Sequence, residues 1–194
     1  MASNPKKLYT PEEYLALERE AEYKSEYYDG EIYAMAGASE EHNLIAGNIF
    51  ASLHSQVRQQ GCRAYISDMR IDMSKKGLYA YPDVVVVCGE SEFSDKHKDN
   101  LVNLRIIVEV LSKSTEAKDR GFKFMCYRKL DSFAEYLLVS QDRPSVEHYV
   151  RQSDNRWVMT EVSDPEDSVG LASIPCELKM SDIYEAITFA SEKE

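Results

Sequence analysis

The spacing of apolar residues predicts two helices in the first third of the chain. Thr10 and Glu13 form a capping-box pattern ahead of apolar residues at helical spacing, which predicts a helix over residues 10–22. Ser39 precedes a longer periodic segment that ends at Gly61, and this segment predicts a core helix of about five turns. Both helices therefore have a recognisable start and one apolar face.

Strand patterns occupy most of the remaining chain. Residues 23–35 place β-forming residues on both sides of Asp29-Gly30, which predicts a hairpin. The alternation over residues 62–73 and the valine-rich run within 78–88 each predict one strand, and the apolar run 104–112 predicts a central strand. Three more strand-like runs follow at hairpin distances, at residues 134–139, 146–151 and 157–162.

Two further helices and one long loop complete the series. Residues 89–103 lack periodicity, and a loop of that length is typical of a functional or mobile segment. Ser114 or Thr115 begins a helix predicted to reach about residue 128. Ser181 begins a predicted C-terminal helix that extends to about residue 191.

This order of elements predicts an α/β (α+β) fold, in which helices pack against a mixed central sheet that follows an N-terminal helix and hairpin. The strands within residues 78–88 and 104–112 should be neighbours, because strands that are consecutive in sequence usually pair. A chain of 194 residues without an internal linker predicts one domain over residues 1–194.

Charge and cysteine usage narrow the classes of protein. The chain has 23 basic and 34 acidic residues, a formal charge of -11, which argues against tight sequence-independent binding of nucleic acid without excluding it. Cys62, Cys88, Cys126 and Cys176 are widely spaced, so we expect free buried thiols in a reducing compartment. The chain starts without a signal-peptide pattern and has no apolar run that could span a membrane, so we expect a cytoplasmic protein with no membrane partner.

Two carboxylates interrupt apolar strand patterns, and they are the strongest chemical signal in the chain. Asp83 follows Pro82 and precedes four valines, and Glu109 lies inside the run 104–112. Because an uncompensated carboxylate is costly in a buried strand, a divalent metal between the two acids would account for both. Asp83 could instead end a turn, and Glu109 could form a buried ion pair with Arg120 or Lys123.

A set of short motifs between residues 10 and 150 carries a family resemblance. The motifs are EYYDGE at 26–31, MAGAS at 35–39, HN at 42–43, SDM at 67–69, YPDV at 81–84, EVLS at 109–112, ST at 114–115, DRGFK at 119–123 and EY at 135–136. Together they resemble the Uma family of endonucleases, within the PD-(D/E)xK restriction-endonuclease-like superfamily.

The resemblance implies a restriction-endonuclease-like fold and metal-dependent hydrolysis of phosphodiester bonds, with DNA as the expected partner. It implies that Asp83, Glu109 and the backbone carbonyl of Val110 bind Mg²⁺, with Mn²⁺ as the alternative ion. The superfamily pattern places a lysine two residues after the glutamate, where this chain has Leu111. Lys123 on the following helix is the matching catalytic lysine, and Glu26 resembles an additional catalytic acid.

Three more residues are accessory candidates, and two of them have a structural alternative. His42 could contact a phosphate or the metal shell, or it could be a helix-end residue without a catalytic role. Asp68 could lie beside the site or on a polar strand face. Asp119 belongs to the same DRGFK motif as Lys123.

The sequence is also compatible with a function that is not enzymatic. The leucine at position 111 and the acidic charge are also compatible with a non-catalytic module that binds nucleic acid or protein on a degenerate nuclease scaffold. The chain could also be a subunit that becomes active as a homodimer, because cutting two strands suits a two-fold pair.

Overall fold

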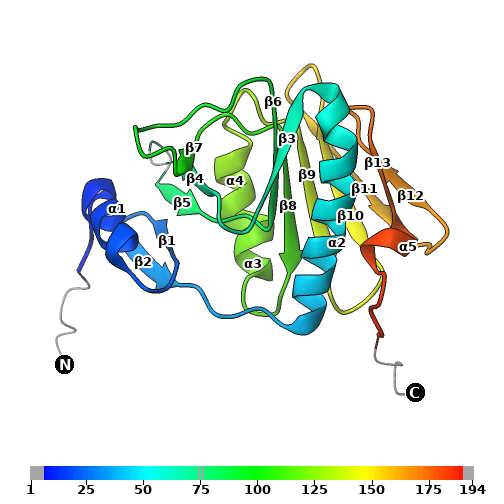
Figure 1. The fold of residues 1–194 in the computed structure, drawn as a ribbon, viewed down its shortest axis with the longest axis horizontal. Coiled ribbons are helices and arrows are strands. Elements are labelled where there is room, and N and C mark those ends of the chain that lie inside the picture. The colour runs from blue at the N-terminus through cyan, green and yellow to red at the C-terminus, as the bar shows by residue number, and fades with distance from the viewer. Residues whose placement is uncertain (1–6, 74, 76, 190–194) are drawn as a thin grey trace.

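Two mixed β-sheets organise the fold (Figure 1), which the computed structural model describes for residues 7–73, 75 and 77–189. The larger sheet has six strands in the order β11-β10-β9-β8-β6-β3. Only β8 and β9 run parallel in it. Its strands are β3 (Cys62–Ile66), β6 (Val84–Cys88), β8 (Ile106–Leu111), β9 (Glu135–Ser140), β10 (Val146–Arg151) and β11 (Trp157–Val162).

The second sheet has five short strands in the order β2-β1-β5-β4-β7. They are β1 (Ser25–Tyr28), β2 (Glu31–Ala34), β4 (Arg70–Met73), β5 (Leu78–Ala80) and β7 (Asn100–Leu101). The predicted hairpin is confirmed as β1 and β2, because Asp29 and Gly30 adopt positive φ angles of 44° and 93° between them. A small pair, β12 (Ser168–Gly170) and β13 (Glu177–Lys179), forms a third sheet, and its Val169 and Leu178 pack in the same core as α2.

The second sheet exists because two predicted strands are each divided. Residues 62–73 were expected to form one strand, but a bend at Ser67, whose φ is 44°, separates β3 from β4. Residues 78–88 were also expected to form one strand, and Pro82 separates β5 from β6. Proline lacks the N–H that a continuous ladder requires, so the sequence contained a signal for the second break.

Two helices match the prediction closely. α1 (Pro11–Glu20) begins with the expected capping box between Thr10 and Glu13. α2 (Glu40–Val57) is capped by the hydroxyl of Ser39 and continues as a 3₁₀ turn (Arg58–Gln60) to Gly61, whose φ is 68°. The buried face of α2 packs on the larger sheet against Val84, Val86, Val108 and Val110.

The other face of the larger sheet is covered by a shorter helical segment. α3 (Glu116–Lys118), a π-helical turn (Asp119–Lys123) and α4 (Phe124–Tyr127) replace the single helix predicted from residue 114 to about 128. α4 packs together with side chains of the second sheet against the alternate residues of β6 and β8, including Val85 and Ile107. In Figure 1, α2 and the pair α3 and α4 lie on opposite sides of β8.

The predicted C-terminal helix is wrong in length. α5 (Met180–Ile183) is a single turn, and residues 184–189 are not helical. Ala186 adopts a positive φ of 62°, which a continuing right-handed helix does not allow. Residues 190 and 191 of the prediction lie outside the described residues. Within the described part of the chain, no helix is long and apolar enough to cross a membrane.

Ion pairs tether the long loop that follows β6. Arg19 of α1 binds Asp95 and lies 2.9 Å from Asp99. Arg70, a buried side chain of β4, donates to the same Asp99 at 2.9 Å and to the hydroxyl of Tyr81 at 2.8 Å. These contacts anchor residues 89–103 to α1 and to the second sheet, so the loop has a structural role.

The expectation of four free thiols is wrong for one pair. Cys62 and Cys88 face each other across β3 and β6 and form a disulfide, whereas Cys126 and Cys176 are free and buried as predicted. The pairing depends on the register of two strands that are 26 residues apart, which the spacing of cysteines alone does not reveal.

The disulfide predicts a measurable contribution to stability. Loss of a cross-link that closes a loop of 26 residues should lower the free energy of unfolding by roughly 3 kcal/mol. Cys62→Ser, Cys88→Ser and the double variant should lose the same amount in chemical denaturation, and a reductant should bring the wild type to their level. Losses that add up in the double variant would mean that the two sulfurs act separately.

Candidate active site

Asp83, which immediately precedes β6, lies opposite Glu109 of β8, and both strands are interior strands of the larger sheet. The antiparallel register pairs Val84 with Val108, which places Asp83 directly across from Glu109 on the same face of the sheet. That face packs against the helical segment that contains Lys123. The predicted neighbouring of the two strands is therefore confirmed, and the two acids converge at one end of them. Glu109 is only 3% exposed.

Lys123 is surrounded by carboxylates. Its Nζ lies 3.3 Å from Glu109 Oε1, 3.1 Å from Glu26 Oε1 and 3.0 Å from Asp119 Oδ1. The π-helical turn brings Asp119 and Lys123 to the same point above β8, while Glu26 approaches from β1 in the second sheet. One buried ammonium thus joins three segments of the chain.

Hydrogen bonds fix the orientation of these carboxylates. The hydroxyl of Tyr127 donates to Glu109 Oε1 at 3.0 Å, and the hydroxyl of Tyr28 donates to Glu26. The buried oxygens Glu26 Oε1 and Asp119 Oδ1 face the ammonium at ion-pair distance but have no partner in hydrogen-bond geometry. Each of these two oxygens can therefore accept a further hydrogen bond or bind a cation.

Asp83 is held from the opposite side. Its Oδ2 accepts the backbone N–H of Val110 at 2.7 Å and lies 3.3 Å from Nε2 of His42 in the first turn of α2. Burial acts to lower the pKa of His42, but the hydrogen bond and charge of Asp83 outweigh it and raise the pKa. His42 thus faces Asp83, although it comes from the helix on the other side of the sheet.

The cluster carries more negative than positive charge. Burial raises the pKa of Glu109 well above its usual range, although Lys123 opposes that shift. Burial also raises the pKa of Asp119. Burial acts to lower the pKa of Lys123, but Glu109 and the other neighbouring anionic groups outweigh it, so the ammonium stays charged. The acids Glu26, Asp83, Glu109 and Asp119 therefore surround one lysine and one histidine, and this surplus attracts a proton or a cation.

The remaining sequence candidates lie elsewhere or pair differently. Asp68 lies at the bend between β3 and β4, with its side chain 89% exposed and 2.7 Å from the ammonium of Lys24. Arg120, the alternative partner considered for Glu109, pairs instead with Glu116 and Glu147. The structural alternative for Glu109, an ion pair with Lys123, is present.

Two tyrosines belong to the cluster and were missed as site residues. Tyr127 follows Lys123 by one helical turn, so its spacing was a usable signal. Tyr28 lies with Tyr27 and Tyr33 in a stripe of tyrosines at strand spacing, a pattern more typical of cross-strand packing than of base stacking. The structure shows that packing, because the rings of Tyr28 and Tyr33 meet edge to face at 5.1 Å.

Oxygen donors of this kind suit a hard divalent cation, but the arrangement is not a ready metal shell. Within the described part of the chain, no group of three or more His, Cys, Asp or Glu side chains is arranged to hold a metal. The ammonium of Lys123 lies among three of the carboxylates. The chemistry of the donors and the surplus of negative charge nevertheless fit a cation between Asp83 and Glu109.

Comparisons with known proteins place this geometry in a family. The chain is 38% identical over 156 residues to the uncharacterized protein sll1609 of Synechocystis sp., a match that covers 80% of this chain and 88% of that one. It is 33% identical over 180 residues to the uncharacterized protein slr1290 of the same organism, which covers 93% of both.

A solved structure shares the fold. The crystal structure described as "a putative nuclease belonging to DUF820 from Anabaena variabilis" superimposes with a TM-score of 0.73 at 20% identity, covering 92% of this chain and 99% of that chain. The predicted nuclease-like α+β fold is thereby confirmed. A family model described as "Uma2: Putative restriction endonuclease" matches residues 11–182. Because this match spans most of the sequence, the chain belongs to the Uma2 family, which is a nuclease family by that description.

Proposed function

We propose that this protein is a metal-dependent endonuclease that hydrolyses phosphodiester bonds in DNA. One observation carries the proposal: the carboxylates of Asp83 and Glu109 face each other across two paired strands, with the ammonium of Lys123 3.3 Å from Glu109. Membership of a nuclease family supports the reaction class. The metal requirement and the choice of DNA are parts of the proposal.

The proposed metal is Mg²⁺, with Mn²⁺ able to replace it. Asp83, Glu109 and the backbone carbonyl of Val110 would hold the ion, because hard cations prefer oxygen donors. When bound there, the ion would lower the pKa of an attacking water and offset the charge that develops on the phosphate.

Lys123 takes the place of the lysine that position 111 lacks. A side chain at position 111 is on the same face of β8 as Glu109, and Leu111 there is buried at 7% exposure. Lys123 brings an ammonium to that face from the helical segment above it. In this proposal Lys123 stabilises charge on the phosphate, Glu26 and Asp119 position Lys123, and His42 orients Asp83.

Three further parts of the proposal concern the whole protein. We propose a single domain over residues 1–194, a cytoplasmic location and a homodimer, which would present two sites to the two strands of a duplex. A cytoplasmic location would expose the Cys62–Cys88 bond to reduction. Light scattering of the purified chain tests the dimer, and the mass of a single chain would contradict it.

A non-catalytic module that binds nucleic acid or protein is the second candidate. The observation that favours it is that Lys123 already compensates three carboxylates without any metal. A closed ion-pair network of this kind could simply connect the two sheets.

Cleavage of supercoiled plasmid in the presence of Mg²⁺ tests the enzyme directly. Asp83→Asn and Glu109→Gln keep the size of each side chain but remove its charge, and each should lower the rate roughly a hundredfold or more. Glu90→Gln is the matched control, because that carboxylate is 93% exposed and should leave the rate unchanged. Equal cutting by all four proteins, or none by the wild type, would refute the proposal.

Calorimetry with Mn²⁺ separates the enzyme from the non-catalytic module. The wild type should bind the ion, and Glu109→Gln should bind it at least about tenfold more weakly because one of two charged donors is lost. Absence of binding to the wild type at about millimolar metal, the weak end of the range for such ions, would favour the module.

Replacing the buried ammonium tests whether Lys123 balances the carboxylates. Lys123→Met leaves Glu26, Glu109 and Asp119 without their shared cation, which should lower the free energy of unfolding by about 3 kcal/mol. Lys129→Met, an exposed lysine at the end of the same helical segment, is the control and should change little. Thermal and chemical denaturation measure both, and equal stability of the two variants would show that the ammonium is not needed to balance the cluster.

A further inference from the structure

A hollow with a mainly apolar lining lies at the opposite end of the larger sheet from the acidic cluster. It has a volume of about 340 Å³, and Arg105, which immediately precedes β8, is part of its lining. Glu109 is four residues further along the strand, a separation of about 13 Å at the usual rise of a β-strand. The hollow is therefore distinct from the candidate active site.

Arg105 is the only charged residue in the lining of this hollow. Among the described residues, no carboxylate forms an ion pair with Arg105, and its guanidinium has no hydrogen-bond partner. The hollow is thus positive in a chain whose formal charge is -11. A half-buried guanidinium without a partner is best compensated by an anion, whose oxygens match its fork of donors.

A buried hydroxyl without a partner lies in the same lining. Ser173 Oγ is buried and has no hydrogen-bond partner. The loop that carries it is fixed, because the N–H groups of Ala172 and Ser173 donate to Glu135 at 2.9 Å and 2.6 Å. Glu135 is itself fully buried and 2.6 Å from Nε2 of His148. The position of the Ser173 backbone is therefore set by this network, while its hydroxyl is unpaired and turned away from the open space of the hollow.

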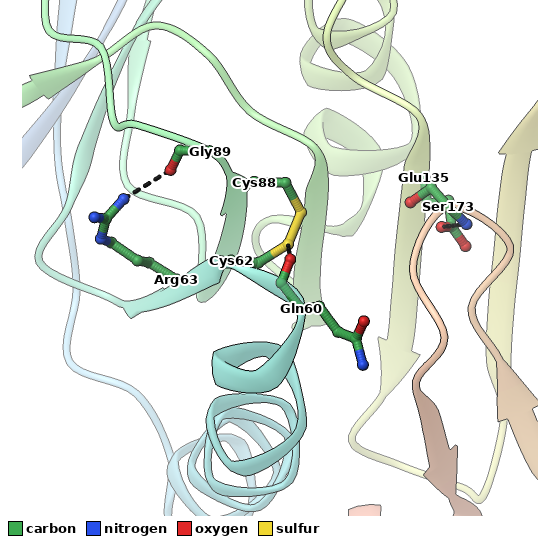
Figure 2. Close-up of a disulfide and its surroundings, with 7 residues drawn as sticks. All are labelled: Gln60, Cys62, Arg63, Cys88, Gly89, Glu135 and Ser173. Carbon is green, nitrogen blue, oxygen red and sulfur yellow. Dashed lines mark hydrogen bonds between the residues drawn. A yellow bond between two sulfur atoms is a disulfide. The ribbon is translucent and has the colours of Figure 1, made fainter.

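The opposite wall is formed by the disulfide and by Gln60 of the 3₁₀ turn that follows α2. Figure 2 shows Cys62 and Cys88 on one side, Ser173 beside Glu135 on the other, and the Gln60 side chain extending between them. Ser132 adds a second hydroxyl, and Ile174 and Pro175 add apolar surface. A mainly apolar wall with a few convergent polar groups is typical of a site for a small molecule.

We propose that this hollow binds a small molecule that carries a phosphate monoester on an apolar or ring body. Arg105 pairs with the phosphate, and the hydroxyl of Ser132 donates to it. Rotation of the Ser173 side chain about its Cα–Cβ bond brings the third donor, which is buried and unpaired without a ligand, to the remaining terminal oxygen. The apolar wall and Gln60 contact the body of the ligand. A hollow of about 340 Å³ is large enough for a ligand of this kind. Occupancy of the site would then depend on the concentration of a phosphorylated metabolite.

Calorimetry on the full chain without divalent metal tests the site with three probes: adenosine 5′-monophosphate, adenosine and inorganic phosphate. The monophosphate should bind more tightly than either of the other two, because it alone supplies both parts of the ligand. Tighter binding of inorganic phosphate would assign the site to a free anion and overturn the proposed class. Tighter binding of adenosine, or no binding of any probe, would overturn the site itself.

Variants then locate the binding. Arg105→Gln should weaken the monophosphate roughly tenfold or more, since it removes a charge-assisted pair. Arg63→Gln is the matched control, because that neighbouring guanidinium donates to the carbonyl of Gly89 at 2.7 Å, does not line the hollow and should leave affinity unchanged (Figure 2). Ser132→Phe keeps Arg105 but fills part of the hollow, so it should also weaken binding of the monophosphate. Unchanged affinity in both Arg105→Gln and Ser132→Phe would place the ligand elsewhere and refute the proposal.

Discussion

The buried ammonium of Lys123 is the interaction on which the two halves of the structure depend. It meets Glu109 from the larger sheet, Glu26 from the second sheet and Asp119 from its own helical segment within 3.3 Å. Because each carboxylate would be costly to bury alone, the cluster holds these segments in register. With Asp83 included, the cluster carries a net negative charge. The ion pairs that join the two sheets therefore also form a site that attracts a cation.

The sequence revealed the chemistry of this cluster because charges are conspicuous inside apolar strands. Asp83 and Glu109 stood out against valine and isoleucine, and the pairing of consecutive strands correctly predicted that they converge. Lys123 was linked to them by the resemblance of its DRGFK motif to the family pattern. The caps of α1 and α2 and the turn at Asp29-Gly30 were predictable for a different reason, since they depend on residues only a few positions apart.

Several features that sequence reasoning missed depend on long-range register, whereas the early end of the C-terminal helix is local. The strand pattern continues through the bend at Ser67, so it could not show that β3 and β4 enter different sheets, whereas Pro82 was a local signal for the break between β5 and β6. The Cys62–Cys88 bond follows from the pairing of β3 with β6, and the contact of His42 with Asp83 joins elements on opposite faces of the sheet. Neither pair shares a local motif, and only the assembled fold brings each together.

The central claim is that Asp83 and Glu109 share a divalent cation where β6 begins beside β8. Anomalous diffraction from crystals soaked in Mn²⁺ measures this most directly, because it locates the ion without reference to activity. The account predicts one strong peak about 2.1 Å from a carboxylate oxygen of both residues, displaced from the nitrogen of Lys123. A peak bound to only one of the two acids, or no peak near either at saturating Mn²⁺, would contradict it.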